Sequence, residues 1–292
     1  MKFIYVQPAI ERFEWELKGS IKSLVDLGVE YSDIVLLFTK HNSRIPIEFS
    51  NKGINVFVFN DERTTEQKEY IPSVRPYLWY RFLSEYPEYE NETFVYLDSD
   101  TVITDLKAFD VKVTKNRWYG SYVAHYIGYD SYLKDIENSD FVVDQMIEAH
   151  GEVSFDWIKK LGDDSVGAQW VIKAPTKEYW KDVFTKSLDI YNATKNLDTN
   201  LQVWTAEMWS QLWTMEKYKL TPKMSKNLDF SFATDKNKDK FIIHNAGVVS
   251  AKNEEGLFFK GDFKQQPTKR DLKSNEDYAQ SIYIQKVKEA LY

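Results

Sequence analysis

The sequence predicts an α/β protein with a mostly parallel central sheet flanked by helices. In the first hundred residues, short runs of β-branched and aromatic residues alternate with segments of helical periodicity. Two of these runs, Asp33–Thr39 and Ile54–Phe59, are almost continuously apolar, as in parallel strands buried on both faces. The 292 residues are 43% hydrophobic and 28% charged, which is typical of globular proteins and excludes a mainly disordered or collagen-like chain.

The first hundred residues hold four expected strands and two expected helices. Apolar residues at positions 13, 17, 21, 24 and 25 have helical spacing, and Pro76 is suited to the first turn of a helix. The expected strands are Lys2–Gln7, Asp33–Thr39, Ile54–Phe59 and Thr93–Leu97, and the expected helices are Phe13–Leu27 and Pro76–Tyr86.

The second part of the chain is less regular. The expected strands are Trp118–His125, Ala168–Lys173 and Lys240–His244, and the expected helices are Asp130–His150, Lys177–Tyr191, Glu207–Lys217 and Asn275–Tyr292. No internal repeat or low-complexity linker interrupts the chain. We therefore expect one domain over residues 1–265, followed by a C-terminal helical extension over 266–292 that packs on it.

Charge and composition exclude several functional classes. The net charge is −7, from 38 Lys and Arg against 45 Asp and Glu, which argues against a generic polyanion-binding protein. Cysteine is absent, so disulfides, thiolate nucleophiles and Cys-ligated zinc are excluded. No stretch of 18 apolar residues predicts a membrane span, and the opening MKFIYVQPAI reads as a strand. A cytoplasmic location is the expectation.

Two carboxylates follow the strand at Thr93–Leu97. Asp98 and Asp100 stand two positions apart, so on an extended segment their side chains point the same way, about 6.6 Å apart. Carboxylate oxygens suit Mn²⁺ or Mg²⁺, and ligands of open α/β sheets bind at the carboxyl ends of the strands. A polar turn after a strand is the alternative explanation of this Asp-Ser-Asp sequence.

One of the four histidines, His244, ends the apolar strand at Lys240–His244. From a neighbouring strand its imidazole can join the two carboxylates as a metal ligand. Gly247, three residues later, permits close approach of the backbone to a bound group. A buried histidine with satisfied hydrogen bonds is the alternative.

The order of these motifs resembles that of metal-dependent GT-A glycosyltransferases of the glycogenin and lipopolysaccharide-galactosyltransferase type. The matching pieces are VYLDSDTVI at 95–103, GAQWVIKAP at 167–175, and FIIHNAG at 241–247 followed by Lys260. The resemblance implies a hexosyltransferase that uses a UDP-sugar, with Asp98, Asp100 and His244 holding the metal and Lys260 contacting the donor diphosphate. It favours retention of anomeric configuration. The chain reads Phe259-Lys260-Gly261 where the family has Lys-Pro-Trp.

The same resemblance places further donor-binding residues. Arg75 precedes a helix at a point where such folds often carry a basic residue that contacts the donor, and a surface arginine covering a helix start is the alternative. Ser99 lies between the two carboxylates. The base and ribose of the nucleotide are expected beside the end of the first strand, at Val6, Gln7, Pro8 and Ala9. The chain has no GxGxxG, which disfavours a dinucleotide-binding Rossmann enzyme.

The acceptor side holds the candidate catalytic groups. Glu207 among tryptophans, Asp164 in the loop before the strand at Ala168–Lys173, and Gln169 on that strand are the candidates. The alternative for Glu207 is an acid in the first turn of a helix, favoured by the helix dipole, and the alternative for Asp164 is a solvated loop residue. Four tryptophans are candidate sugar platforms: Trp118, Trp170, Trp204 and Trp209.

Two other functions stay open at this point. A sugar nucleotidyltransferase also uses an α/β sheet and acidic metal ligands, but VQPAIERFEW lacks the Gly-rich phosphate loop of that class. A carbohydrate-binding protein without activity would explain the 16% aromatic content and would bind no nucleotide. The acceptor is open among glycans, proteins and modified DNA bases; for DNA, the lysines at 217, 219, 223 and 226 form the densest basic run.

Overall fold

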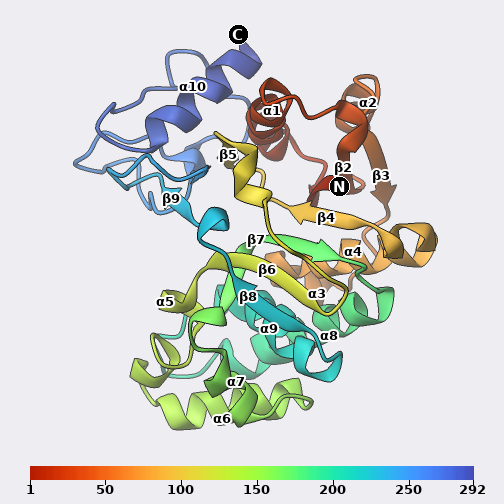
Figure 1. Ribbon diagram of the computed structural model, residues 1–292. Helices are drawn as coiled ribbons and strands as arrows, with labels where there is room; N and C mark the ends of the chain where they lie inside the picture. The colour runs from red at the N-terminus through yellow and green to blue at the C-terminus, as the bar shows by residue number, and fades with distance from the viewer. The chain divides into compact units, whose positions relative to one another are not determined.

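The computed structural model describes residues 1–292, which form two compact units. The first, here the terminal unit, comprises residues 3–58, 97–110 and 227–292, and the second, the middle unit, comprises residues 1–2, 59–96 and 111–226. Figure 1 shows strands and helices along the whole chain. The predicted α/β class, with a mostly parallel sheet flanked by helices and a C-terminal helix, is confirmed.

The terminal unit is built on β1 and β2, which are parallel and pair from Phe3 with Ile34 to Pro8 with Thr39. Its sheet order is β3-β2-β1, and all six residues of β2 are buried, as the apolar run predicts. The same prediction is wrong for β3, which is an edge strand with only Phe59 buried. The strands are β1 (Lys2–Pro8), β2 (Ile34–Thr39) and β3 (Asn55–Phe59), and the helices are α1 (Glu11–Asp26), α2 (Arg44–Ser50) and α10 (Gln280–Leu291).

The terminal unit also holds a small second sheet of three short strands in the order β5-β10-β9. These strands are β5 (Thr101–Ile103), β9 (Phe230–Phe232) and β10 (Ile242–His244). Only β10 was expected from the sequence, because it ends an apolar run, whereas β5 and β9 are too short to show a periodic pattern.

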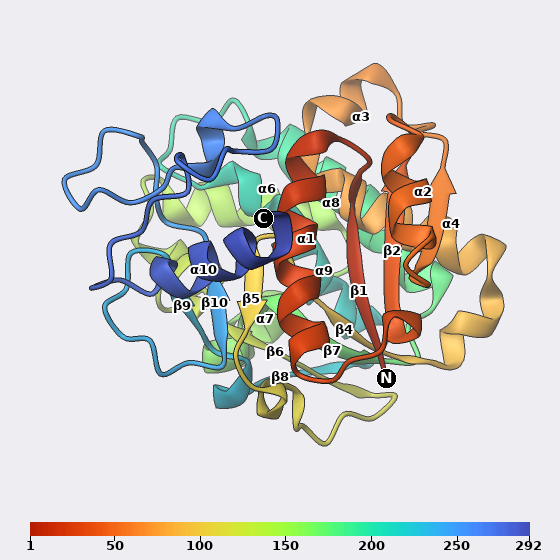
Figure 2. The same cartoon turned by 90° about the horizontal axis from the view of Figure 1, so that it is seen from above.

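Helices α1 and α10 lie side by side, as Figure 2 shows. They share an apolar cluster that includes Trp15, Tyr283, Ile284 and Val287. The crossing is close at Gly19, where an added Cβ would lie 2.7 Å from Cγ2 of Val287. The C-terminal helix is therefore an integral layer of the terminal unit, although the expected boundary at residue 265 stays a prediction.

The middle unit has strands in the order β4-β7-β6-β8. β7 runs antiparallel to β4 and β6, while β6 and β8 are parallel, so β4 and β6 end at the same edge. The strands are β4 (Thr93–Tyr96), β6 (Arg117–Tyr122), β7 (Val166–Lys173) and β8 (Thr221–Met224). The helices are α3 (Thr65–Glu69), α4 (Val74–Glu85), α5 (Ala124–Ile127), α6 (Ser139–His150), α7 (Phe155–Leu161), α8 (Lys177–Thr194) and α9 (Ala206–Lys217).

Aromatic residues join the helices of the middle unit. The rings of Trp79 in α4 and Trp180 in α8 stack with centroids 4.9 Å apart, and the hydroxyl of Tyr179 donates to the carbonyl of Gln211 in α9.

Two elements of the middle unit are shorter in the structure than the sequence predicts. The strand expected at 118–125 ends at Tyr122, and the helix expected at 130–150 begins only at Ser139, after Asn138 adopts a left-handed conformation.

Candidate functional site

Pairing of two short strands brings His244 to the Asp-Ser-Asp sequence. β5 begins at Thr101, directly after Asp100, and pairs antiparallel with β10 so that Thr101 lies opposite His244. The amide of Asn245 donates to the carbonyl of Asp100 at 2.9 Å, which fixes this register. The residues predicted as metal ligands therefore meet within the terminal unit, although 144 positions separate Asp100 from His244.

Asp98 and Asp100 do not lie on an extended strand. β4 ends at Tyr96, and residues 98–101 form a turn in which the carbonyl of Asp98 accepts hydrogen bonds from the amide and the hydroxyl of Thr101. The geometric premise of two side chains on one strand face is wrong. The carboxylates still converge, because Nε2 of His244 lies 3.3 Å from Oδ1 of Asp100 and 3.7 Å from Oδ2 of Asp98.

The pKa values of Asp100 and His244 are shifted by burial and by the charges around them. Burial alone would raise the pKa of Asp100, but the Lys260 ammonium and the His244 ring outweigh burial and hold that pKa well below its usual range. Burial would likewise lower the pKa of His244, whereas Asp100 and Asp98 raise it above its ordinary value. Asp100 is therefore a buried carboxylate that lies between the Lys260 ammonium and the His244 ring.

Lys260 forms an ion pair with Oδ2 of Asp100. Its loop is held by Gln280, the first residue of α10, whose side chain exchanges hydrogen bonds with the backbone of Phe258 and donates to Oδ1 of Asn245 at 2.8 Å. One glutamine thus links the segment after His244 to the segment before Lys260. The predicted Lys260 lies beside the predicted carboxylates even though the Lys-Pro-Trp sequence is missing.

Glu16 of α1 completes the cluster, and the sequence did not indicate it. Its Oε2 accepts a hydrogen bond of 2.6 Å from the hydroxyl of Ser99, and its side chain is 1% exposed. Burial raises the pKa of Glu16, and the nearby charge of Lys260 opposes that rise. The Ser99 side chain thus faces α1, so a donor contact of Ser99 would use its backbone. In the sequence, Glu16 could have been noticed only as an acidic residue beside the apolar stripe of α1.

The donor set suits a divalent cation in chemistry, although it is not preformed. Two carboxylates and one imidazole nitrogen are ligands that Mn²⁺ accepts, and an ammonium already lies against one of the carboxylates. No group of three or more His, Asp or Glu side chains is yet spaced around a common centre. His244 lies directly against the carboxylates of Asp98 and Asp100 instead, so metal binding requires small side-chain movements.

A second feature of the terminal unit lies at the carboxyl end of β1, where the nucleotide was expected. Gln7 is 6% exposed and its side-chain Nε2 has no hydrogen-bond partner. Ala9 is buried, and its amide donates to the carbonyl of Thr39. Gly247 has a φ of +93°, which favours glycine at this position. The side-chain amide of Gln7 is thus a buried donor without a partner, which a polar ligand at the end of β1 would satisfy.

Arg75 and Glu207 are both buried in the middle unit and bind each other. Nε of Arg75 donates to Oε1 of Glu207, its Nη2 donates to Oε1 of Gln211 at 2.6 Å, and its guanidinium lies 4.7 Å from the ring centre of Tyr96. Arg75 is thus not a surface residue at a helix start. The roles predicted for Arg75 in donor binding and for Glu207 in catalysis stay predictions, and the structure gives each residue a structural partner.

The other two candidate catalytic residues also have partners in the middle unit. Asp164 accepts hydrogen bonds from Nζ of Lys223 at 2.6 Å and from the amide of Met224 at 2.9 Å, which joins its turn to β8. Gln169 on β7 is fully buried, and its Oε1 accepts a hydrogen bond of 2.9 Å from the hydroxyl of Ser121. Their catalytic roles remain predictions.

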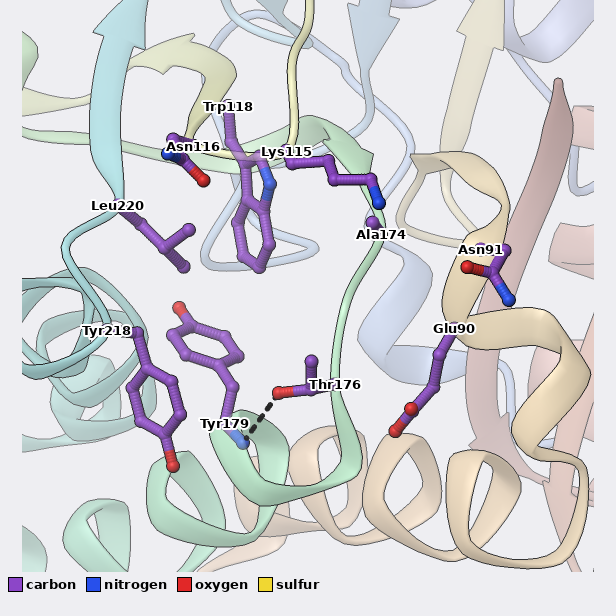
Figure 3. A pocket seen from close by; sticks show the side chains of 10 residues that line it. All are labelled: Glu90, Asn91, Lys115, Asn116, Trp118, Ala174, Thr176, Tyr179, Tyr218 and Leu220. Atoms are coloured by element: carbon purple, nitrogen blue, oxygen red, sulfur yellow. Dashed lines mark hydrogen bonds between the residues drawn. The ribbon is translucent and has the colours of Figure 1, made fainter.

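Of the four candidate sugar platforms, only Trp204 is exposed. Trp118, Trp170 and Trp209 are at most 1% exposed, so the prediction that they present flat faces is wrong. Trp118 does line a pocket of about 360 Å³, beside Tyr179 (Figure 3), but its indole donates inward to the carbonyl of Lys173. These rings fill the core because aromatic side chains bury large apolar areas.

Trp204 is 56% exposed, and Tyr126 lies beside it with ring planes 28° apart. The edge of His125 meets Tyr126 in turn, at 4.8 Å between ring centres. This aromatic row follows the carboxyl end of β6, at the edge of the middle unit where β4 also ends.

Comparison with known proteins gives a result at the level of fold. No protein-family model matches the chain, and no curated protein matches its sequence. The apo structure of the bifunctional glycosyltransferase WbbM matches with a TM-score of 0.50 and 13% identity, over 96% of this chain and 50% of that one. The apo glycosyltransferase GlyE of Streptococcus pneumoniae TIGR4 matches at 0.47 and 12%, over 99% and 64%. The galactosyltransferase LgtC, solved with donor and acceptor sugar analogues, matches at 0.46 and 11%, over 87% and 90%.

The chain therefore spans half the length of WbbM and about two thirds of that of GlyE. No helix is both long enough and apolar enough to cross a bilayer. The likeness to WbbM covers nearly the whole chain. The chain has the fold of the GT-A glycosyltransferases.

Proposed function

We propose that this protein is a glycosyltransferase that moves a hexose from a UDP-sugar to an acceptor hydroxyl with the help of Mn²⁺ or Mg²⁺. The observation that carries the proposal is the convergence of Asp98, Asp100, His244 and Lys260 in one unit of a GT-A fold. Carboxylate, imidazole and ammonium groups together suit a metal-bound diphosphate. A carbohydrate-binding protein without activity would have no use for this combination.

Each residue has a defined task in the proposed reaction. Asp98, Asp100 and His244 would hold the metal, which stabilises the negative charge of the departing nucleoside diphosphate. Lys260 adds a positive charge beside the same diphosphate. The unpartnered amide of Gln7 supports a nucleoside site along residues 6–9. The pairing of Glu207 with Arg75 leaves no clear general base, which favours retention of configuration.

The acceptor side is represented by Trp204 and Tyr126. A sugar ring presents C–H bonds that pack on the negative face of an aromatic ring, so this exposed pair suits a saccharide acceptor. DNA is disfavoured, because Lys217 is paired with Asp182 and Lys223 with Asp164. We therefore favour a glycan over a modified DNA base as acceptor.

Calorimetric titration with UDP in Mn²⁺ and in EDTA tests the proposal. We expect UDP binding that requires the metal, and slow hydrolysis of one UDP-sugar in a screen of UDP- and GDP-sugars. Asp100→Ala should lose both, while Asp105→Ala, an exposed acid of the same unit, should keep both. Binding of UDP that ignores the metal, or full hydrolysis by Asp100→Ala, would refute the metal assignment.

A further inference from the structure

Lys260 lies against a carboxylate that the proposed metal site uses. Its ammonium is ion-paired with Asp100, which is 5% exposed. The side chain of Lys260 retains 24% exposure, which leaves it room to move.

We propose that Lys260 competes with the divalent metal ion for Asp100. The inference rests on the proposed function and adds the order of binding to it. A metal ion bound to Asp100 would face the ammonium at the same carboxylate, and two cations repel each other. The metal therefore binds well only when the ammonium has another partner, and the diphosphate of the donor supplies one.

Metal and nucleotide should consequently strengthen each other's binding. Thermodynamic linkage requires that UDP raise the affinity for Mn²⁺ by the same factor as Mn²⁺ raises the affinity for UDP. In the absence of nucleotide, Lys260 keeps Asp100 neutralised, and the site binds Mn²⁺ weakly.

The test is the Mn²⁺ dissociation constant, measured by electron paramagnetic resonance of free Mn²⁺ with and without UDP. Lys260→Met should bind Mn²⁺ at least about tenfold more tightly than wild type without UDP, and its gain from UDP should be smaller by a similar factor. Lys260→Gln serves as a second variant, and circular dichroism checks that each variant folds.

Lys240→Met is the matched control. Lys240 is ion-paired with Asp229, near the opposite end of β10 from His244. Removing it changes the net charge by the same amount without freeing Asp100. We expect its Mn²⁺ affinity to stay within about twofold of wild type, and an effect equal to that of Lys260→Met would reduce the inference to general charge.

The experiment distinguishes a failure of this inference from a failure of the proposed function. If wild type binds Mn²⁺ with UDP but Lys260→Met binds it no better without UDP, competition at Asp100 is refuted and the proposed function stands. If wild type binds no Mn²⁺ even with UDP, the metal-dependent function itself is refuted and the inference falls with it.

Discussion

Replacement of Glu207 by Gln separates a structural from a catalytic role for this acid. The change keeps the shape and one oxygen acceptor of the side chain and removes its charge. Arg75 keeps its hydrogen bond to Gln211 and its position over the Tyr96 ring, but its guanidinium loses the buried counter-charge. The side chains of Arg75 and Glu207 are 10% and 6% exposed, so water cannot replace the lost partner.

The expected magnitude follows from this burial. Removing one member of a buried ion pair destabilises proteins by about 3–5 kcal/mol, and the retained hydrogen bond places Glu207→Gln near 3 kcal/mol. The acid also lies in the first turn of α9, where a negative charge contributes roughly 0.3–1 kcal/mol. We expect a total loss of about 3–4 kcal/mol in the free energy of unfolding.

Urea unfolding followed by tryptophan fluorescence measures this loss, since Trp209 and Trp213 lie in the same helix. The double variant Arg75→Met/Glu207→Met should recover part of the stability, because no charge stays buried alone. Donor hydrolysis of the folded fraction of Glu207→Gln should persist. A stability within about 1 kcal/mol of wild type together with complete loss of activity would refute this reasoning and assign Glu207 to catalysis.

Three further expectations concern other parts of the protein. Asp98→Asn and His244→Ala should abolish Mn²⁺-dependent UDP binding and change the free energy of unfolding by less than about 1 kcal/mol, since neither residue lies in the interior of a helix or long strand; unfolding of either variant would indicate a structural role. Trp204→Ala should lose saturation-transfer NMR contacts with methyl glycosides while donor hydrolysis is unchanged, and Phe141→Ala, another exposed aromatic of the middle unit, should lose neither. Burial lowers the pKa of His150 to about 4 from 6.5, so the unfolded chain binds more protons between these values and stability falls by up to roughly 3 kcal/mol as pH drops from 6.5 to 4; His150→Gln should flatten urea midpoints over that range, and an unchanged slope would contradict the assignment.

The regular part of the fold could be predicted because its pattern is local. β2 is an uninterrupted apolar run, and α1, α8 and α9 carry apolar stripes that the sequence displays directly. β5 and β9 have three residues each and exist only through their pairing with β10. Such strands are defined by distant partners and leave no periodic signal.

The candidate site divides in the same way. Asp98, Asp100 and His244 follow apolar runs, so strand ends and residue chemistry were enough to single them out. Glu16 lies inside a helix, and Gln280 acts on backbone atoms of Phe258, 22 positions away. The pairing of Arg75 with Glu207 spans 132 positions. No local pattern reports contacts of this kind, because the tertiary fold creates them.

Arg75 and Lys260 differ in a way that bears on their roles. Arg75 uses several nitrogens at once, on Glu207 and Gln211, and its planar group lies over an aromatic ring. The planar guanidinium holds its donors in a fixed arrangement, and it would lose several contacts by moving. Lys260 is a single charge on a flexible stem and contacts Asp100 alone through an ion pair, so it can transfer to another anion with little rearrangement. The chemistry of the side chains thus favours Arg75 as a fixed link between α4 and α9, and Lys260 as the cation that exchanges its partner when donor and metal bind.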